Sequence, residues 1–239
     1  MPAFLEDIEG FYGTNEKNKA GDDLKSFLEQ YDAKKYDNPS VTADIIVIKA
    51  KEEITTVNHG LQLLMVKRAD HPCIGLWALP GGFVNIREDV EQAAKRELFE
   101  ETGLDHIAIE QIYTWGEYDR DPRARIVTVA YLAVISEQEL EVTAGDDAAD
   151  ATFADVTFEQ IESKEISEKD KIKIENTYAL RLTNSEKDFD LSATIITTQN
   201  KYGLLKEKTY RVVESSGIAF DHSRFIVQAL LYIKDLLDC

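Results

Sequence analysis

The stretch GGFVNIREDVEQAAKRELFEETGL, residues 81–104, decides the fold that this sequence predicts. Within it, Asp89 followed three residues later by Gln92 is typical of a helix N-terminus, where the two side chains cap free backbone N–H groups. Gly103 suits the left-handed backbone that commonly follows the last helical residue. The pattern therefore predicts a helix over 90–102, with valine, alanine and leucine side chains forming an apolar stripe along one face.

Three acidic residues gather at the end of this predicted helix: Glu97, Glu100 and Glu101. Residues three and four apart share a helix face, so the three carboxylates project together. Like charges at this spacing cost about 0.2–0.5 kcal/mol per pair, and an acid near a helix C-terminus opposes the macrodipole by about 0.3–1 kcal/mol. One interpretation is a solvated acidic face in a chain whose formal charge is -18. The other is a site that receives a cation.

The spacing of the fixed residues decides between these interpretations. From Gly82 the sequence reads G, five residues, E, seven residues, and then RELFEETGL. With average amino-acid usage, the probability that these fixed residues occur by chance is on the order of 10⁻⁹ to 10⁻⁸ per start position. The segment resembles the signature of the Nudix hydrolases, in which a loop, a helix and a second loop bind magnesium or manganese and face a diphosphate linked to a further group.

The resemblance implies that Mg²⁺ or Mn²⁺ is held by four groups: Glu97 and Glu101 as principal ligands, Glu100 through a second ion or a bound water, and the carbonyl of Gly81. Arg96 and Glu88 resemble the pair that holds the catalytic glutamates in place. The residue types suit this chemistry, because Mg²⁺ accepts oxygen ligands and is usually held by a few carboxylates together with substrate phosphates. Such an ion lowers the pKa of a bound water and orients it for attack on phosphorus.

Segments on both sides of the signature narrow the resemblance. VKRADHPCIGLWALPGGFV leads into the helix, YDRDPRARIVTVAYLAVI and AGDDAADATFADV follow it, and IAFDHSRFIVQALLYIKDLL lies near the C-terminus. Together they resemble the ADP-ribose pyrophosphatase branch of the family and the related Nudix regulators of NAD metabolism. The resemblance covers about residues 36–156 and the final helix.

Further residues are candidates for the catalytic base and for binding the substrate. In this branch a loop acid often acts as the catalytic base, which makes Asp146 and Asp147 candidates here; an Asp pair after a glycine is equally typical of a turn. Four residues are candidates for binding the substrate: Arg68, Phe83, Arg120 and Arg123. A guanidinium fork fits phosphate and ribose oxygens well, although each arginine also fits a surface ion pair.

The composition argues against several classes of protein. The strong acidity, a formal charge of -18, opposes non-specific binding to nucleic acid or anionic membranes. No apolar run reaches the length of a membrane span, and the acidic segment MPAFLEDIEGFYG lacks the basic region of a signal peptide, so we expect a cytoplasmic protein. Cys73 and Cys239 cannot form a disulfide framework, and Cys73 is best interpreted as a packed side chain.

Apolar patterning predicts strands around the signature helix at 41–50, 61–68, 106–115, 125–135 and 151–156. The fold class is therefore α+β, a mixed β-sheet between helices, as in the α/β/α sandwich of the Nudix fold. The expected parts are an N-terminal helical extension (1–38), the Nudix domain (39–163), an inserted β-rich segment (164–216) and a C-terminal helix that packs on the Nudix domain or on a dimer partner (217–239).

The β-rich segment 164–216 has three interpretations. KIENTYALRLTN, LSATIITTQN and KTYRVVESSG alternate apolar or β-branched residues with polar ones, which predicts a β-meander before the last helix. A sheet extension that packs on the core is favoured over a direct role in substrate binding, and the size of the segment also suits a subunit interface. We expect a homodimer to which this segment or the final helix contributes.

The function predicted is metal-dependent hydrolysis of a nucleoside diphosphate linked to another group. The favoured reaction is the hydrolysis of ADP-ribose to AMP and ribose 5-phosphate. The signature fixes the reaction class and leaves the substrate open, so a sugar nucleotide, NADH or a dinucleoside polyphosphate are alternatives. A ligand-binding sensor of NAD metabolism is the alternative from another class. Related regulators carry a winged-helix DNA-binding domain after the final helix, and because this chain ends at Cys239, we favour the enzyme.

Overall fold

The computed structural model describes residues 4–136, 148–168, 171–204 and 207–238. The chain divides into two compact units, Met1–Pro39 and Ser40–Cys239. The first unit holds a 3₁₀-helix, η1 (Glu9–Phe11), and an α-helix, α1 (Leu24–Gln30), and neither buries a residue. No helix within the described ranges is long and apolar enough to cross a membrane.

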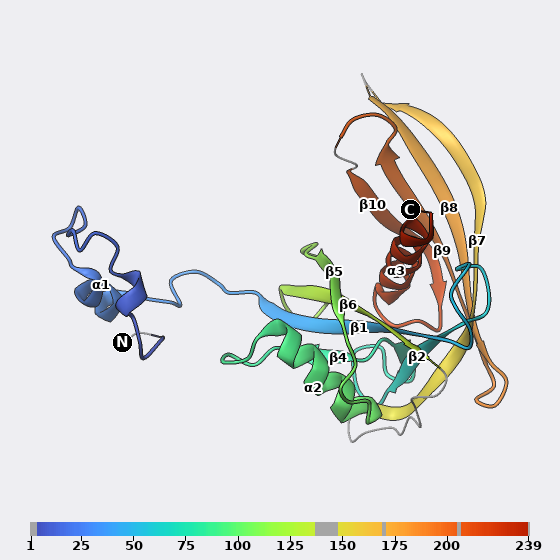
Figure 1. Cartoon of the computed structure of the whole chain (residues 1–239), viewed down its shortest axis with the longest axis horizontal. Coiled ribbons are helices and arrows are strands. Elements are labelled where there is room, and N and C mark those ends of the chain that lie inside the picture. The colour runs from blue at the N-terminus through green and yellow to red at the C-terminus, as the bar shows by residue number, and fades with distance from the viewer. Residues whose placement is uncertain (1–3, 137–147, 169–170, 205–206, 239) are drawn as a thin grey trace. The chain divides into compact units, whose positions relative to one another are not determined.

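The second unit is built on one sheet (Figure 1). Its described strands are β1 (Ser40–Ala50), β2 (Leu61–Arg68), β3 (Trp77–Ala78), β4 (Gly81–Phe83), β5 (Glu110–Trp115), β6 (Ile126–Ser136), β7 (Ala148–Glu168), β8 (Lys171–Asn184), β9 (Phe189–Asn200) and β10 (Lys208–Ser216). The order across the sheet is β10-β9-β8-β7-β2-β1-β6-β5, with β3 paired to β2 and β4 paired to β1. Strands β1 and β6 are parallel, whereas β1 is antiparallel to β2, so the sheet is mixed.

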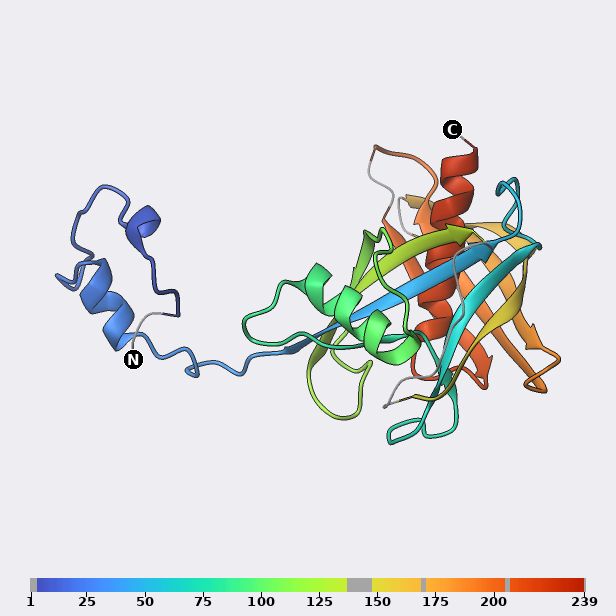
Figure 2. The same ribbon diagram turned by 60° about the horizontal axis from the view of Figure 1, so that its bottom comes forward.

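Strand β1 is buried on both faces, which explains its continuous apolar run. Ile46 and Ile48 belong to the core on the side of α3 (His222–Leu237), whereas Ile45 and Val47 belong to the core on the side of α2 (Val90–Thr102). The two helices therefore cover opposite faces of the sheet (Figure 2). The predicted fold class, a mixed sheet between helices, is confirmed.

Helix α2 has the bounds that the sequence predicts, and both of its ends are capped as expected. At its start the side chain of Gln92 accepts a hydrogen bond from the Asp89 N–H at 3.1 Å. At its end Gly103 adopts φ 74° and its N–H donates to the Phe99 carbonyl at 2.8 Å. These local signals fix the helix, and with it the place of the glutamates.

Strand β7 belongs both to the main sheet and to the meander. Its first part pairs with β2 and its later part with β8, so it runs through residues 163 and 164, where the sequence pattern places the start of the inserted segment. Phe158, Leu180 and Ile195 of the meander share one buried core with the side chains of α3. The meander thus extends the main sheet and forms the surface on which α3 packs.

The two ends of the sheet come together around α3. Tyr210 of β10 lies 5.5 Å, centre to centre, from Trp115 of β5, and Trp115 stacks on Phe225 of α3 at 4.7 Å and 8°. The segment before α3 is tied to β3, because the Trp77 N–H donates to the Gly217 carbonyl at 2.9 Å. This curvature brings the start of α3 beside the loop between β5 and β6.

Candidate active site

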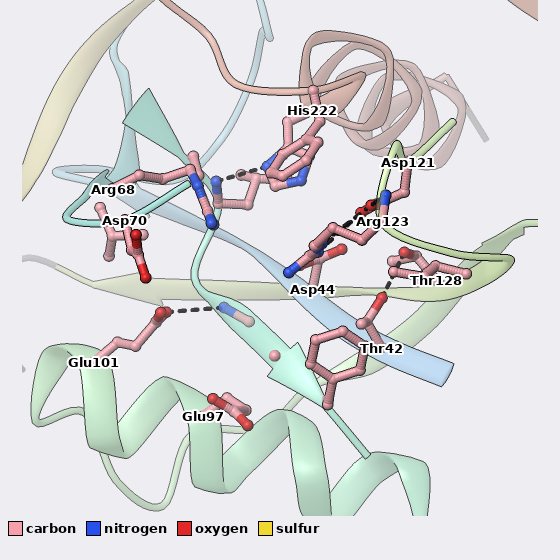
Figure 3. Close-up of a pocket in the computed structure, with 18 of the residues that line it drawn as sticks. Thr42, Asp44, Arg68, Asp70, Glu97, Glu101, Asp121, Arg123, Thr128 and His222 are labelled. Carbon is pink, nitrogen blue, oxygen red and sulfur yellow. Dashed lines mark hydrogen bonds and ion pairs between the residues drawn. The ribbon is translucent and has the colours of Figure 1, made fainter. Parts of the chain in front are cut away.

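Two glycines of β4 allow the end of α2 to approach closely. The Gly81 N–H donates to Glu101 Oε2 at 2.9 Å. A Cβ at Gly82 would lie 2.4 Å from the Glu97 carboxyl group, and a Cβ at Gly81 would lie 2.5 Å from Asp44 Oδ1. A Cβ at Gly81 would also meet the Ala43 carbonyl oxygen at 2.3 Å, so only glycine fits there, whereas a Cβ at Gly82 would have to displace the Glu97 carboxyl group (Figure 3).

Arg96 holds three acidic side chains of this region. Its Nε and Nη2 donate to the two oxygens of Glu88 at 2.8 and 2.9 Å, and its Nη1 donates to Glu97 at 2.6 Å and to Glu100 at 3.0 Å. The hydrogen bond from Arg96 lowers the pKa of Glu88 to about 2. Within the described residues no ion pair reaches Glu101, which accepts its hydrogen bond from the Gly81 N–H.

Burial makes two of the central carboxylates difficult to ionise. It raises the pKa of Glu101 to about 8, and the neighbouring charges of Glu97 and Asp44 add to this effect. Burial also raises the pKa of Asp44 to about 7, against the attraction of the Arg120 guanidinium. A divalent cation beside these groups would favour their charged forms.

The oxygen donors of the pocket fit a hard divalent ion that takes only some of its ligands from the protein. In the described residues no three His, Cys, Asp or Glu side chains are gathered as a complete metal site. Glu97 and Glu101 nonetheless face the same pocket as the Gly81 backbone. Mg²⁺ is commonly held by one or two carboxylates, with waters and substrate phosphates completing its shell. The observed acids therefore suit Mg²⁺ or Mn²⁺ together with a phosphate ligand.

The pocket has a volume of about 550 Å³ and two chemically different walls. Glu97 and Glu101 form what we call the acidic wall (Figure 3). The basic wall carries three arginines and two rings: Arg68, Arg120, Arg123, Phe220 and His222. A cation would be attracted to the first wall and an anionic or planar ligand to the second.

The NUDIX domain model matches residues 39–176, more than half of the chain. The chain belongs to the NUDIX family. It is 36% identical over 135 residues to an ADP-ribose pyrophosphatase from Methanocaldococcus jannaschii, a match that covers 55% of this chain and 73% of that protein. It is also 38% identical over 115 residues to the ADPR responsive transcriptional repressor NtrR from Acinetobacter baylyi, covering 47% of this chain and 43% of the repressor. The match thus spans less than half of the repressor.

Among solved structures, a MutT/nudix family protein from Enterococcus faecalis is similar to this NUDIX chain with a TM-score of 0.60 and 30% identity. The similarity covers 87% of this chain and 67% of that chain. It therefore extends well beyond the matched domain. The Nudix resemblance seen in the sequence is confirmed.

Two of the predicted arginines of this NUDIX pocket lie against aromatic rings. The guanidinium carbon of Arg68 is 5.0 Å from the ring centre of Phe220. That of Arg123 is 5.2 Å from the Phe83 ring and 5.7 Å from the Phe220 ring, and Arg123 also pairs with Asp121 at 2.8 Å. All of these side chains line the pocket. The structure therefore brings the predicted substrate-binding residues together.

Arg120 lines the same pocket but is held by the partly buried Asp221 and the buried Thr128. Its Nε and Nη2 donate to the two oxygens of Asp221 at 3.1 and 2.9 Å, and its Nη1 donates to Thr128 Oγ1 at 2.5 Å. Its side chain is only 6% exposed, so the alternative of a surface ion pair does not describe it.

The remaining predicted acids lie elsewhere. The Glu100 side chain is 54% exposed, pairs with Arg96 and is not among the residues that line the pocket. Asp146 and Asp147 lie outside the described residues. The structure thus places Glu97 and Glu101 in the pocket and Glu100 on its outer side.

The sequence reasoning missed several residues of the NUDIX pocket, among them Asp44, Phe220 and His222. His222 is buried, and its Nδ1 accepts a hydrogen bond from the Leu79 N–H at 3.0 Å. Burial lowers its pKa to about 4, so the ring is a neutral acceptor. The available signals were a lone acid within the apolar run TADIIVIKA and the polar pair after Phe220 in IAFDHSRF.

Proposed function

We propose that this protein hydrolyses ADP-ribose to AMP and ribose 5-phosphate with Mg²⁺ or Mn²⁺. The observation that carries the proposal is the meeting of an acidic wall and a basic wall in one pocket. A diphosphate between two ribosyl groups suits this pocket, because its charge requires a cation beside the acids and its oxygens suit guanidinium donors. The ADP-ribose pyrophosphatase of M. jannaschii, which the match covers over 73% of its length, supports this choice of substrate.

The metal ligands in this proposal are Glu97, Glu101 and the Gly81 carbonyl. Glu100, on the outer side of α2, would assist through a second ion or a bound water. A bound ion neutralises the diphosphate and supplies a water of lowered pKa. Arg96 keeps Glu97 in place, since it already donates to that carboxylate at 2.6 Å. The pocket acids thus remain oriented toward the ligand.

The reaction joins the oxygen of a water to one phosphorus while the bridging P–O bond on that phosphorus breaks. The departing phosphate leaves with the bridging oxygen, and a base takes a proton from the water. We retain Asp146 and Asp147 as candidates for that base. Arg68, Arg120 and Arg123 would bind phosphate and ribose oxygens of the substrate, and the Phe83 ring, 43% exposed beside the pocket, would provide an apolar contact surface.

A panel of diphosphates tests the proposal. ADP-ribose, NADH, a sugar nucleotide, a diadenosine polyphosphate and an oxidised nucleoside triphosphate are each incubated with the protein and Mg²⁺ or Mn²⁺, and the products are identified by chromatography. We expect ADP-ribose to give AMP and ribose 5-phosphate with the highest kcat/KM. Higher kcat/KM for another member would change the substrate, and equal hydrolysis of simple phosphate esters would contradict the reaction class.

A sensor of ADP-ribose is the second candidate function, favoured by the 38% identity to the repressor NtrR. A titration of the protein against duplex DNA from NAD-metabolism promoters, with and without ADP-ribose, separates the two functions. The formal charge of -18 opposes DNA binding, so we expect none at moderate salt. Tight, sequence-specific binding released by ADP-ribose would favour the sensor.

We also infer that the protein forms a homodimer through its meander. Three apolar side chains of the meander are exposed on separate strands and could each contact a partner: Ile161, Ile172 and Val213 are 57%, 38% and 50% exposed. Deleting the meander is a poor test, because it would remove the surface on which α3 packs. Light scattering on the wild type and on Ile161→Asp is sharper: we expect a dimer that weakens in the variant, whereas a wild-type monomer would contradict the inference.

A further inference from the structure

The start of α3 completes the pocket although it lies beyond the matched NUDIX domain. Phe220 and His222 both line the pocket, and the domain match ends at residue 176. Asp221 stands between them, and its side chain is only 14% exposed. The segment therefore presents two pocket residues and one partly buried acid to the same region.

Asp221 binds two arginines at once. Arg120 donates to both of its carboxylate oxygens, at 3.1 and 2.9 Å, and Arg224 donates to Oδ2 at 2.5 Å from Nη2 and 3.1 Å from Nε. The side chains of Arg120 and Arg224 are 6% and 11% exposed. Because paired charges with little water around them are held firmly in one geometry, Asp221 fixes the orientation of the Arg120 fork.

The fork of Arg120 retains N–H donors that no described residue accepts from. A guanidinium has five N–H donors. The described hydrogen bonds occupy three of them: Nε and one on Nη2 with Asp221, and one on Nη1 with Thr128. One N–H remains on each terminal nitrogen, and each of those nitrogens is already held through its other hydrogen. Since Arg120 lines the pocket, these two donors are oriented before a ligand arrives.

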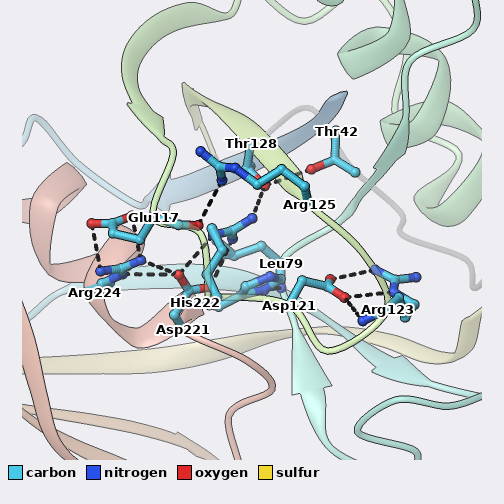
Figure 4. Close-up of polar contacts among 11 residues, drawn as sticks. Thr42, Leu79, Glu117, Asp121, Arg123, Arg125, Thr128, Asp221, His222 and Arg224 are labelled. Carbon is cyan, nitrogen blue, oxygen red and sulfur yellow. Dashed lines mark hydrogen bonds and ion pairs between the residues drawn. The ribbon is translucent and has the colours of Figure 1, made fainter. Parts of the chain in front are cut away.

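A second pair strengthens the attachment of this loop to α3. Arg224 donates to the two oxygens of Glu117 at 3.1 and 3.0 Å, and Glu117 lies on the same loop as Arg120 (Figure 4). Arg125 joins the ends of that loop by donating to the carbonyls of Gly116 and Glu117 at 2.7 and 3.0 Å. The loop that carries Arg120 and Arg123 is thus fixed to the helix by two bidentate contacts.

We propose that Asp221 is a positioning residue for substrate binding: it holds Arg120 so that the two remaining N–H donors meet a phosphate or ribose oxygen of the substrate. The proposal rests on the function proposed above and assigns to α3 a part in substrate affinity. A role in folding alone would change the stability of the protein without a selective change in KM. The two roles are therefore separable by kinetics.

The test compares Asp221→Asn with Asp190→Asn. Asp190 forms a comparable bidentate pair with Arg181 on the exposed surface of β8 and β9, which makes it a matched control. We expect Asp221→Asn to raise KM for ADP-ribose at least about tenfold and to change kcat by less than roughly threefold. This rise in KM corresponds to the loss of one charge-assisted hydrogen bond from Arg120 to the substrate. Mn²⁺ affinity should stay within about twofold, because the metal ligands are untouched. A folded Asp221→Asn protein with unchanged KM, or with a loss in kcat alone, would overturn the proposal.

Two further measurements keep the proposal testable. If Asp221→Asn does not fold, Glu117→Gln replaces it, because that carboxylate is 49% exposed at the outer end of the network. A KM rise of about two- to fivefold would support the proposal, and an unchanged KM would overturn it. If the wild type binds ADP-ribose without cleaving it, the proposed function fails, and calorimetry then tests the positioning role. Binding about tenfold weaker in Asp221→Asn than in the wild type would support that role. Equal affinity of the two proteins, or no binding by the wild type, would overturn it.

Discussion

The two walls of the pocket differ in how the chain builds them. The acidic wall comes from one continuous stretch, 81–104, in which caps, glycines and glutamates lie a few residues apart. The basic wall is assembled from the end of β2, the loop between β5 and β6, and the start of α3. One of its arginines, Arg120, is held by Asp221, a residue 101 positions away in the sequence.

This difference indicates a division of labour. In the function proposed above, the compact local motif binds the metal that acts on the diphosphate, so damage to it should abolish turnover. The dispersed wall would bind phosphate and ribose oxygens, so damage to it should weaken binding and leave turnover largely intact. The following predictions test that division, beginning with the largest effect.

Glu101→Gln should lower kcat/KM by roughly 10³-fold, because the variant loses a charged oxygen ligand for the metal. Steady-state kinetics with saturating Mg²⁺ checks this. Glu91→Gln is the matched control on the same helix, since Glu91 is exposed and pairs only with Lys95 among the described contacts, at 2.6 Å. Retention of more than a tenth of the activity by Glu101→Gln would contradict the acidic wall as the catalytic half.

Gly82→Ala should lower kcat/KM by about 10²-fold, because the added Cβ would lie 2.4 Å from the Glu97 carboxyl group and must displace it. Circular dichroism should show that the fold is retained. Gly116→Ala provides the control, as a Cβ there meets no atom within 4 Å. Full activity of Gly82→Ala would show that the position of Glu97 is not critical.

His222 belongs to the basic wall, yet we expect it to affect stability. Its folded pKa of about 4 lies below the ordinary 6.5, so its contribution is present above pH 6.5 and is lost as the pH falls toward 4. Between pH 7 and pH 5 the free energy of unfolding should fall by about 2 kcal/mol on this account. The charged groups that act on this ring are Asp221, Arg120, Arg68 and Asp121.

Urea denaturation at both pH values measures this effect. His222→Gln keeps an acceptor near the Leu79 N–H and removes the titration, so the variant should lose that part of the pH dependence. Other titrating groups are common to both proteins and cancel in the comparison. Identical pH dependence in the two proteins would show that His222 is protonated without cost.

Arg123→Lys should raise KM for ADP-ribose about tenfold with little change in kcat, because lysine keeps the charge and loses the planar fork. Arg123 also lies 5.2 Å from the ring of Phe83, a contact that lysine reproduces poorly. Arg181→Lys, on the exposed surface, is the control. A loss confined to kcat would place Arg123 with the catalytic groups and would contradict the claim that the basic wall acts mainly on substrate affinity.

The sequence predicted the locally determined parts of this molecule. Helix α2 and strand β2 have the expected bounds, because their caps and apolar patterns lie within a few residues of their ends. The contacts of Arg96 with Glu88 and Glu97 also agree with what the Nudix resemblance implies for this pair.

The parts that the sequence did not predict depend on distant pairing. Nothing near Arg120 indicates Asp221 as its partner, and Asp44 becomes a pocket residue because strand β1 pairs it with Gly81 of β4. The length of β7 is similar: its alternation suits a strand, but its continuity depends on β2 and β8 pairing with it in turn.

The most direct test of the account is the effect of Mg²⁺ on the unfolding midpoint of the wild type, Glu101→Gln and Glu91→Gln. At an Mg²⁺ concentration about 100 times its Kd, binding adds about 2.7 kcal/mol, which raises the midpoint by roughly 5–10 °C for a chain of this size. We predict that rise for the wild type and Glu91→Gln, and little or none for Glu101→Gln. Equal rises in all three proteins would contradict the claim that the acidic wall binds the metal.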